Sequence, residues 1–185
     1  MKAIQDLRME HDAVRLTLKV LERMAQKIER DGSLANPQHM DHLLEFFTIF
    51  VDKCHHGKEE ELLFPAMELA GVARDKGPIG VMLREHELGR ECVQKMQAAF
   101  SRIKAGELKA AKDFVRNAHD YISLLNQHID KENNVLFPMA ERQLSEATLA
   151  ELSKGFERIE EQKIGVGKHE EFHKMIDQLE SAYLK

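Results

Sequence analysis

Residues 55–65 read His-His-Gly-Lys-Glu-Glu-Glu-Leu-Leu-Phe-Pro, and residues 128–138 read His-Ile-Asp-Lys-Glu-Asn-Asn-Val-Leu-Phe-Pro. The two stretches share a histidine, a lysine, a glutamate and the Leu-Phe-Pro triplet, at a constant offset of 73 residues. A second motif also recurs: Glu10-His11 followed by Arg15 returns as Glu85-His86 followed by Arg90, at an offset of 75 residues. The chain therefore contains one unit of sequence twice.

Each motif lies on an apolar pattern with helical spacing. Between residues 4 and 28, and again between residues 79 and 103, side chains of one face recur at alternating steps of three and four. The sequence predicts long helices over about 4–28, 38–64, 79–103 and 114–135, with breaks or kinks at Pro65 and Pro138. Further helices are expected over 145–163, with Ser145 as N-cap, and over 168–184, after a glycine hinge at 165–167.

Long helices joined by short or medium loops are typical of an all-α, up-down-up-down four-helix bundle. Helices one and two form a hairpin that recurs as helices three and four, so the bundle should have a pseudo-twofold axis. We expect residues 1–141 to form this bundle of two repeated hairpins. Residues 142–185 should form a C-terminal extension of one or two helices packed on the bundle.

Composition narrows the class of protein. The chain has 185 residues, 43% of them apolar and 32% charged, which suits one compact domain and excludes a mainly disordered chain. The net charge of −5 argues against a nucleic-acid-binding module. The apolar runs are too short to span a bilayer, and Glu10 and Asp12 lie where a signal peptide needs apolar residues. We therefore expect a cytoplasmic protein with no nucleic-acid or membrane partner.

The repeated histidines and glutamates have the spacing of metal ligands. His55 and Glu59, like His128 and Glu132, are four residues apart, so each pair shares one helical face. Carboxylates buried without partners are costly, and a metal ion is a partner that imidazole and carboxylate both suit. We expect two divalent ions, each bound by two histidines and bridged by the two glutamates. The candidate ligands are His11, His55, Glu59, His86, His128 and Glu132.

The reading frame of the first motif is ambiguous, because His56 and Glu60 have the same spacing as His55 and Glu59. Alignment on the Leu-Phe-Pro triplets pairs His56 with Ile129 and Glu60 with Asn133. This alignment favours the frame of His55 and leaves that of His56 as the alternative. We expect surface positions for His39, His42, His56 and His119.

Over about residues 6–140, these motifs resemble the hemerythrin-like HHE cation-binding family. The resemblance implies a four-helix bundle with a non-haem di-iron centre and the same six ligands. Oxygen-carrying hemerythrins have a histidine where this chain has Arg90, and an aspartate where it has Asn133. Four histidines and two glutamates are instead similar to the bacterial iron–sulfur-cluster repair di-iron proteins, whose cysteine-bearing N-terminal region has no counterpart here. These departures speak against reversible oxygen carriage and against a cluster-repair role.

The resemblance implies two iron ions as cofactor, joined by an oxo or hydroxo bridge, with zinc or manganese as alternatives. The expected function is to bind or react with a small oxidant such as dioxygen, nitric oxide or peroxide. One alternative is a non-catalytic iron or oxygen sensor, or an iron-handling module, that signals by conformational change. Another is a bundle that holds zinc or a structural metal. Whether the chain is an enzyme stays open, a homodimer is among the expected assemblies, and no redox partner is identified.

Several further residues have two interpretations each. Tyr121 and Gly89 either line an access path to the metals or pack in the core. Arg15 and Arg90 pair either with the buried carboxylates Glu10 and Glu85 or with solvent. A metal-binding role outside the repeat is open for His169 and His173, and structural thiols are expected at Cys54 and Cys92.

Overall fold

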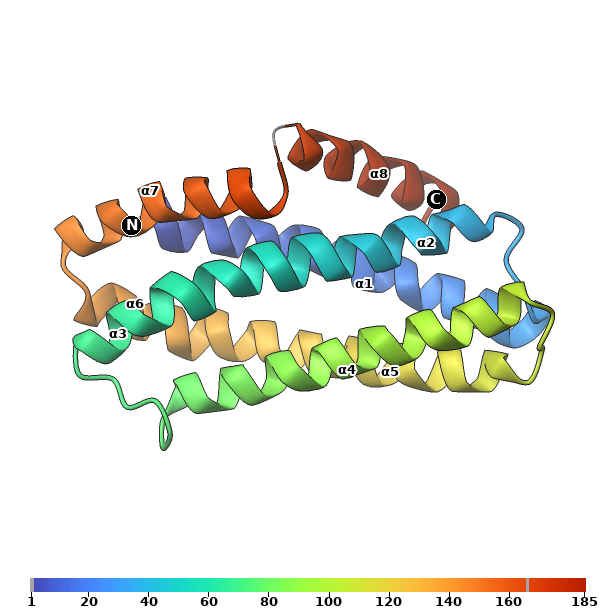
Figure 1. Ribbon diagram of the computed structural model, residues 1–185, viewed down its shortest axis with the longest axis horizontal. Coiled ribbons are helices and arrows are strands. Elements are labelled where there is room, and N and C mark those ends of the chain that lie inside the picture. The colour runs from blue at the N-terminus through green and yellow to red at the C-terminus, as the bar shows by residue number, and fades with distance from the viewer. Residues whose placement is uncertain (1, 166) are drawn as a thin grey trace.

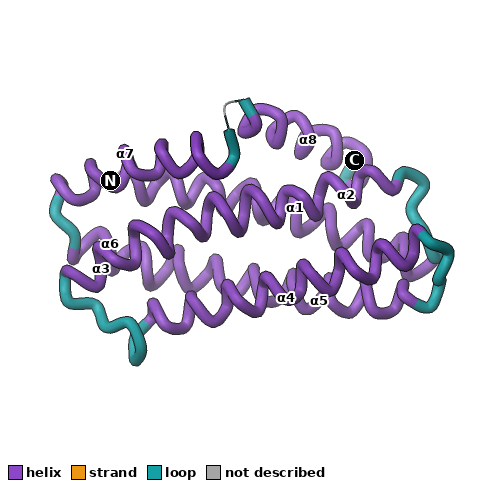
Figure 2. Tube along the Cα trace, in the orientation of Figure 1, coloured by secondary structure: helices purple, strands orange, loops and turns teal. Residues whose placement is uncertain are grey.

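A computed structural model describes residues 2–165 and 167–185, and all of its regular structure is helical (Figures 1 and 2). Four long helical rods run side by side, and two shorter helices lie along one side of them. In the described part of the chain, no helix combines the length and the apolar character needed to cross a membrane. The elements are α1 (Lys2–Asp31), α2 (Pro37–Phe46), η1 (Phe47–His56), η2 (Glu59–Leu63), α3 (Phe64–Leu69), α4 (Pro78–Lys104), α5 (Ala110–Lys131), η3 (Glu132–Leu136), α6 (Phe137–Gln143), α7 (Glu146–Lys163) and α8 (Lys168–Tyr183).

The first and third rods are single α-helices, as the apolar stripes predict. The stripe of α1 is fully buried from Ile4 to Ile28, and the helix ends at Gly32, whose φ of 73° suits glycine. Helix α4 begins at Pro78 and ends before Gly106, which has a φ of 90°. The all-α bundle with additional C-terminal helices is thereby confirmed.

Of the break or kink predicted at Pro65 and at Pro138, the break is wrong at both. The second rod continues from α2 through η1, η2 and α3 to Leu69, and the fourth continues from α5 through η3 and α6 to Gln143. Each proline follows a π-helical segment, in which the N–H of Phe64 bonds to the carbonyl of Glu59 and that of Phe137 to the carbonyl of Glu132. These wider turns bring each proline to the start of a new α-helical segment, where a missing N–H is tolerated.

The bundle core is divided into two clusters of buried apolar side chains. One cluster, with Ile4, Leu7 and Phe64, lies towards the Leu-Phe-Pro ends of the rods. The other, with Val14 and Phe114, fills the opposite half. Along α1, His11 falls between Leu7 of the first cluster and Val14 of the second. A layer of buried polar residues therefore crosses the bundle between two apolar halves.

The C-terminal helices cover α1 and the second rod (Figure 1). Helix α7 begins at Ser145, whose side chain accepts a hydrogen bond from the Thr148 N–H, as the N-cap prediction requires. Phe156 of α7 joins the first apolar cluster, and Phe172 of α8 joins the second. The predicted hinge at 165–167 includes Val166, which lies outside the described residues. The division of the chain into domains at residue 141 stays a prediction.

Candidate metal centre

The six predicted ligands lie together in the polar layer of the bundle. They come from all four rods: His11 from α1, His55 and Glu59 from the π-helical part of the second rod, His86 from α4, and His128 and Glu132 from the junction of α5 and η3. Each is at most 2% exposed. The bundle thus brings together residues that are up to 121 positions apart in the sequence.

The four histidines form two facing pairs. The Nε2 atoms of His11 and His55 are 3.0 Å apart, and those of His86 and His128 are 3.2 Å apart. Because each pair contains one histidine from each helix of one repeated hairpin, the two pairs are related by the pseudo-twofold repeat. The sequence repeat is therefore also a repeat of the site.

The two glutamates lie between the histidine pairs. Glu132 places one oxygen 3.1 Å from His11 Nε2 and the other 3.2 Å from His128 Nε2. Glu59 places one oxygen 3.8 Å from His55 Nε2 and the other 3.4 Å from His86 Nε2. Each carboxylate thus faces both histidine pairs. Each pair, together with one oxygen of Glu59 and one of Glu132, forms a group of metal-donor atoms, so the two donor groups lie side by side and share both carboxylates.

The chemistry of these donors fits metal cations. Within the described chain, none of the four oxygens of Glu59 and Glu132 has a hydrogen-bonding partner, although both residues are fully buried. Burial and the neighbouring Glu132 raise the pKa of Glu59 well above its usual range. His128 and His11 lower the pKa of Glu132 well below the usual range of a glutamate, although burial acts in the opposite direction. Two buried carboxylates that repel each other and lack hydrogen bonds are a site that cations stabilise.

Residues outside the centre contact Nδ1, the second ring nitrogen, of each of the four ligand histidines. Glu10 accepts a hydrogen bond from His55 Nδ1 at 2.7 Å, Glu85 from His128 Nδ1 at 3.0 Å, and Glu60 from His86 Nδ1 at 2.7 Å. Asn133 Oδ1 lies 3.0 Å from His11 Nδ1. Because a carboxylate only accepts, each such histidine donates from Nδ1, and its Nε2 faces the centre. Metal-binding histidines are usually oriented in this way by a carboxylate or carbonyl on the other ring nitrogen.

The two repeated lysines contact carboxylates of these outer residues. Lys58 forms ion pairs with Glu10 and with Glu160 of α7, and Lys131 forms an ion pair with Glu85. Lys58 is 1% exposed, whereas the side chain of Lys131 is 42% exposed. Although burial opposes it, the contacts with His55 and Lys58 lower the pKa of Glu10 to about 2. Glu10 and Glu85 are therefore each held ionised with the help of a lysine of their own hairpin.

A model of the hemerythrin HHE cation-binding domain matches residues 2–140, three quarters of the chain. This chain belongs to the hemerythrin HHE cation-binding family. The family relationship agrees with the helical bundle and with the two donor groups described above.

The chain is similar to several curated proteins, among them iron–sulfur cluster repair proteins. Over 134 residues, the chain is 31% identical to the iron–sulfur cluster repair protein YtfE of Edwardsiella ictaluri and 30% identical to YtfE of Escherichia coli, covering 70% of this chain and 60% of each relative. It is also 23% identical over 163 residues to an uncharacterized protein of Mycobacterium tuberculosis, covering 88% of this chain and 63% of that protein. The chain thus spans less than two thirds of the length of these curated relatives.

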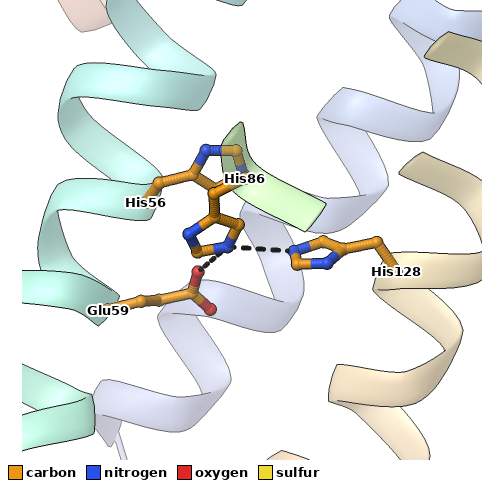
Figure 3. A group of neighbouring side chains, drawn as sticks. All are labelled: His56, Glu59, His86 and His128. Carbon is orange, nitrogen blue, oxygen red and sulfur yellow. Dashed lines mark hydrogen bonds and ion pairs between the residues drawn. The ribbon is translucent and has the colours of Figure 1, made fainter. Parts of the chain in front are cut away.

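Sequence reasoning misplaced one histidine of this hemerythrin-family site. His56, expected at the surface, is 4% exposed, and its ring stacks on that of His86 with centroids 3.8 Å apart. Figure 3 shows His56 above His86, with Glu59 and His128 around the same point, and donor atoms of all four lie within 4.8 Å of one another. In a π-helix successive side chains turn by less than the 100° of an α-helix, so His55 and His56 both face the core. Burial lowers the pKa of His56 to about 4, which keeps the ring neutral.

Of the two interpretations of the repeated arginines, pairing with Glu10 or Glu85 is wrong. Arg15 pairs with Asp130 at 2.7 Å, and Arg90 pairs with Asp52 and Glu60, both at 2.6 Å. Glu60, the alternative ligand of the His56 frame, therefore lies outside the centre, between His86 and Arg90. Among the other histidines, His42 and His119 are exposed as predicted, while His39 is half-buried beside Tyr183.

The histidines of α8 do not reach the donor groups. His169 and His173 contact each other, and His169 lies against Phe50, with ring centroids 5.7 Å apart. Both line a cavity of about 380 Å³ between α1, α7 and α8. Neither belongs to a metal-binding group of three or more residues in the described chain.

The cysteines and the predicted access residues also have clear positions. Cys54 is buried, and burial raises the pKa of its thiol to about 12, in agreement with a structural role. Cys92 is half-buried, and burial raises its pKa as well. Tyr121 and Gly89 both line a cavity of about 200 Å³ that also reaches His56. Both residues thus pack in the core and border a cavity beside His56, and their role in access to the metals stays a prediction.

Proposed function

We propose that this chain is a non-haem di-iron protein that binds or reacts with a small oxidant. The observation that carries the proposal is the shared position of Glu59 and Glu132, each with one oxygen towards each histidine pair. His11 and His55 would hold one iron, His86 and His128 the other, and the two glutamates would bridge them. The similarity to the iron–sulfur cluster repair protein YtfE supports iron over zinc or manganese.

When bound, iron supplies the one-electron chemistry that no amino-acid side chain offers. The chain supplies binding, orientation and exclusion of water. Glu10, Glu60 and Glu85 hold protons on the Nδ1 atoms of three histidines, which directs their Nε2 lone pairs inward. The apolar clusters on either side of the polar layer restrict solvent access, so a small molecule has an advantage over a large one.

Metal analysis tests the centre itself. Protein purified from iron-supplemented cells should contain about two irons per chain by plasma mass spectrometry, and a His128→Ala, Glu132→Ala variant should lose them. Stopped-flow mixing of the diferrous protein with dioxygen, nitric oxide and peroxide then tests the reaction. A spectrum that none of the three changes would refute the proposed function, and zinc in place of iron would favour a structural-metal bundle.

One observation favours the sensor or iron-handling alternative. A continuous set of contacts runs from His55 to Glu10, from Glu10 to Lys58, and from Lys58 to Glu160 of α7. Loss or oxidation of iron at His55 could therefore change the position of α7 through these contacts. Limited proteolysis of the metal-free, diferrous and diferric forms tests this alternative, because identical cleavage patterns would contradict a conformational signal. For the di-iron protein proposed above, we also propose a cytoplasmic location, a homodimer and an external redox partner.

A further inference from the structure

The two halves of the pseudo-symmetric bundle differ where they border the metal centre. His56 in the first hairpin corresponds to Ile129 in the second, and Gly89 in the second corresponds to Val14 in the first. Both differences lie on the same side of the bundle, because His56 and Gly89 line one cavity between η1 and α4. The two sides of the bundle that the repeat relates are therefore not equivalent beside the metal centre.

The first side has a cavity of about 200 Å³ that is lined by His56, whose ring stacks on that of the candidate ligand His86. Arg90 and Asp52, joined by an ion pair of 2.6 Å, stand on its wall. Gly89 leaves space beside Tyr121, since a methyl group at this position would be 3.6 Å from the Tyr121 ring and from Leu125. His56 lines the same cavity while one of its nitrogens lies within 4.8 Å of donor atoms of His86 and His128.

The opposite side is closed by apolar side chains. Val14 and Ile129, the counterparts of Gly89 and His56, are each 1% exposed. The groove outside them, between α1 and α5, is lined by residues that include Arg15, Leu18 and Asn126, and by neither Val14 nor Ile129. Entry to the centre from this side would require these two apolar residues to move.

His56 is buried without a hydrogen-bonding partner. Neither ring nitrogen has one within the described chain, and the nearest carboxylate oxygen, on Asp52, is 3.7 Å from Nδ1. An imidazole left in this state costs free energy, so a partner that enters the cavity would be stabilised. The ring planes of His56 and His86 are only 13° apart in a stack, which prevents both in-plane lone pairs from pointing at the same ion. This geometry suits a hydrogen bond from His56 to a guest better than a third histidine ligand.

We propose that the cavity between η1 and α4 is the entry for the small molecule, and that His56 hydrogen-bonds this molecule beside the His86–His128 pair. This inference rests on the proposed function and specifies the ligand class. An imidazole offers an N–H donor and a nitrogen acceptor that point in different directions, and hydrogen peroxide can pair with either one, through a lone pair or through an O–H group. Dioxygen and nitric oxide are weak acceptors and can pair only with the N–H, so His56 favours peroxide and other strongly accepting small molecules.

The test uses azide as a probe of the iron-loaded protein, with binding followed by absorbance and iron content measured in every variant. A His56→Ile variant copies the residue of the other hairpin, and we expect azide affinity to fall about two- to tenfold, the effect of one neutral hydrogen bond. A His56→Gln variant should recover most of the affinity. Nitric oxide also only accepts a hydrogen bond but carries no negative charge, so its affinity for the diferrous protein should fall less than that of azide in His56→Ile.

A Gly89→Val variant copies Val14 and should slow azide association and dissociation together, because it narrows the path without touching the donors. The matched control is Asn126→Phe, which fills the groove on the closed side and should leave both rates unchanged. Wild-type rates and affinity in both His56→Ile and Gly89→Val would overturn the inference while leaving the di-iron function intact. Loss of iron from His56→Ile would overturn it by making His56 a ligand. If wild-type protein with two irons responds to neither azide nor peroxide, the proposed function fails as well.

Discussion

Lys58 offers the sharpest test of how the centre is supported, because its repeat counterpart is a built-in control. The lysine is 1% exposed and pairs with Glu10, which is 8% exposed and also accepts a hydrogen bond from His55. These partners move the pKa of Glu10 from 4.5 to about 2 despite its burial, which corresponds to about 3 kcal/mol in favour of the ionised form. Removal of one partner from a buried ion pair typically costs about 3–5 kcal/mol, since the other charge stays buried. We expect Lys58→Met to destabilise the metal-free protein by about 3 kcal/mol at pH 7.

Urea unfolding followed by circular dichroism measures this free energy. The control is Lys131→Met, because Lys131 pairs with Glu85 in the equivalent place but has a side chain that is 42% exposed, so its loss should cost about 0–1 kcal/mol. Adding Glu10→Gln to Lys58→Met should recover part of the stability by removing the unpaired charge.

The pH dependence gives a second reading of the same interaction. A folded-state pKa below the unfolded value stabilises the protein above about pH 4.5, and this contribution is lost as the pH falls towards about 2. The Lys58→Met variant should therefore lose less stability than the wild type across this window. Equal losses for Lys58→Met and Lys131→Met at pH 7 would refute the reasoning from burial.

Three further predictions follow from the same geometry. In the metal-free protein, Glu132 and Glu85 raise the pKa of His128 to about 9 against the effect of burial. Metal binding below that pH should therefore release a proton, and the apparent metal affinity should rise with pH. Titration calorimetry in buffers of different ionisation enthalpy measures this proton release, and a binding heat that does not depend on the buffer would contradict it. Phe172→Ala in α8 removes a ring packed on Phe46 and Phe50 and should cost about 3–5 kcal/mol in urea unfolding, whereas a loss below about 1 kcal/mol would mean that α8 does not stabilise the bundle. Chelation of the bound metal should lower the melting temperature of the wild type but not of the His128→Ala, Glu132→Ala variant, and equal shifts would place the metal elsewhere.

The π-helical segments explain most of the differences between sequence-based expectation and structure. A hydrogen bond from residue i to residue i+5 leaves no clear mark in a pattern of three and four, so the continuation of the rods past Pro65 and Pro138 could not be read from the spacing. The same segments turn His56 inward. The repeat instead suggested that His56 lies at the surface, because its counterpart Ile129 cannot bind a metal.

The charged residues illustrate a second limit. Arg15 and Arg90 follow their histidines by the same number of residues, yet one pairs with Asp130 and the other with Asp52 and Glu60. Local spacing predicts which residues share a helix face. It does not predict which long side chain of a neighbouring helix comes within reach, because that depends on the offset and the rotation between two helices.

By itself, the sequence determined that this chain is a bundle of two repeated hairpins with four histidines and two glutamates on its inner faces. Helical periodicity and the offset of the repeat are local properties, and burial of apolar stripes leaves one arrangement that places all six residues in the same layer. Only the tertiary structure decided that Lys58 is buried by α7, that Glu60 and Asn133 hold different histidines, and that a cavity lined by His56 and Gly89 lies between η1 and α4. These features depend on how the helices pack against one another, and packing is set by the whole set of interlocking side chains rather than by any one stretch of sequence.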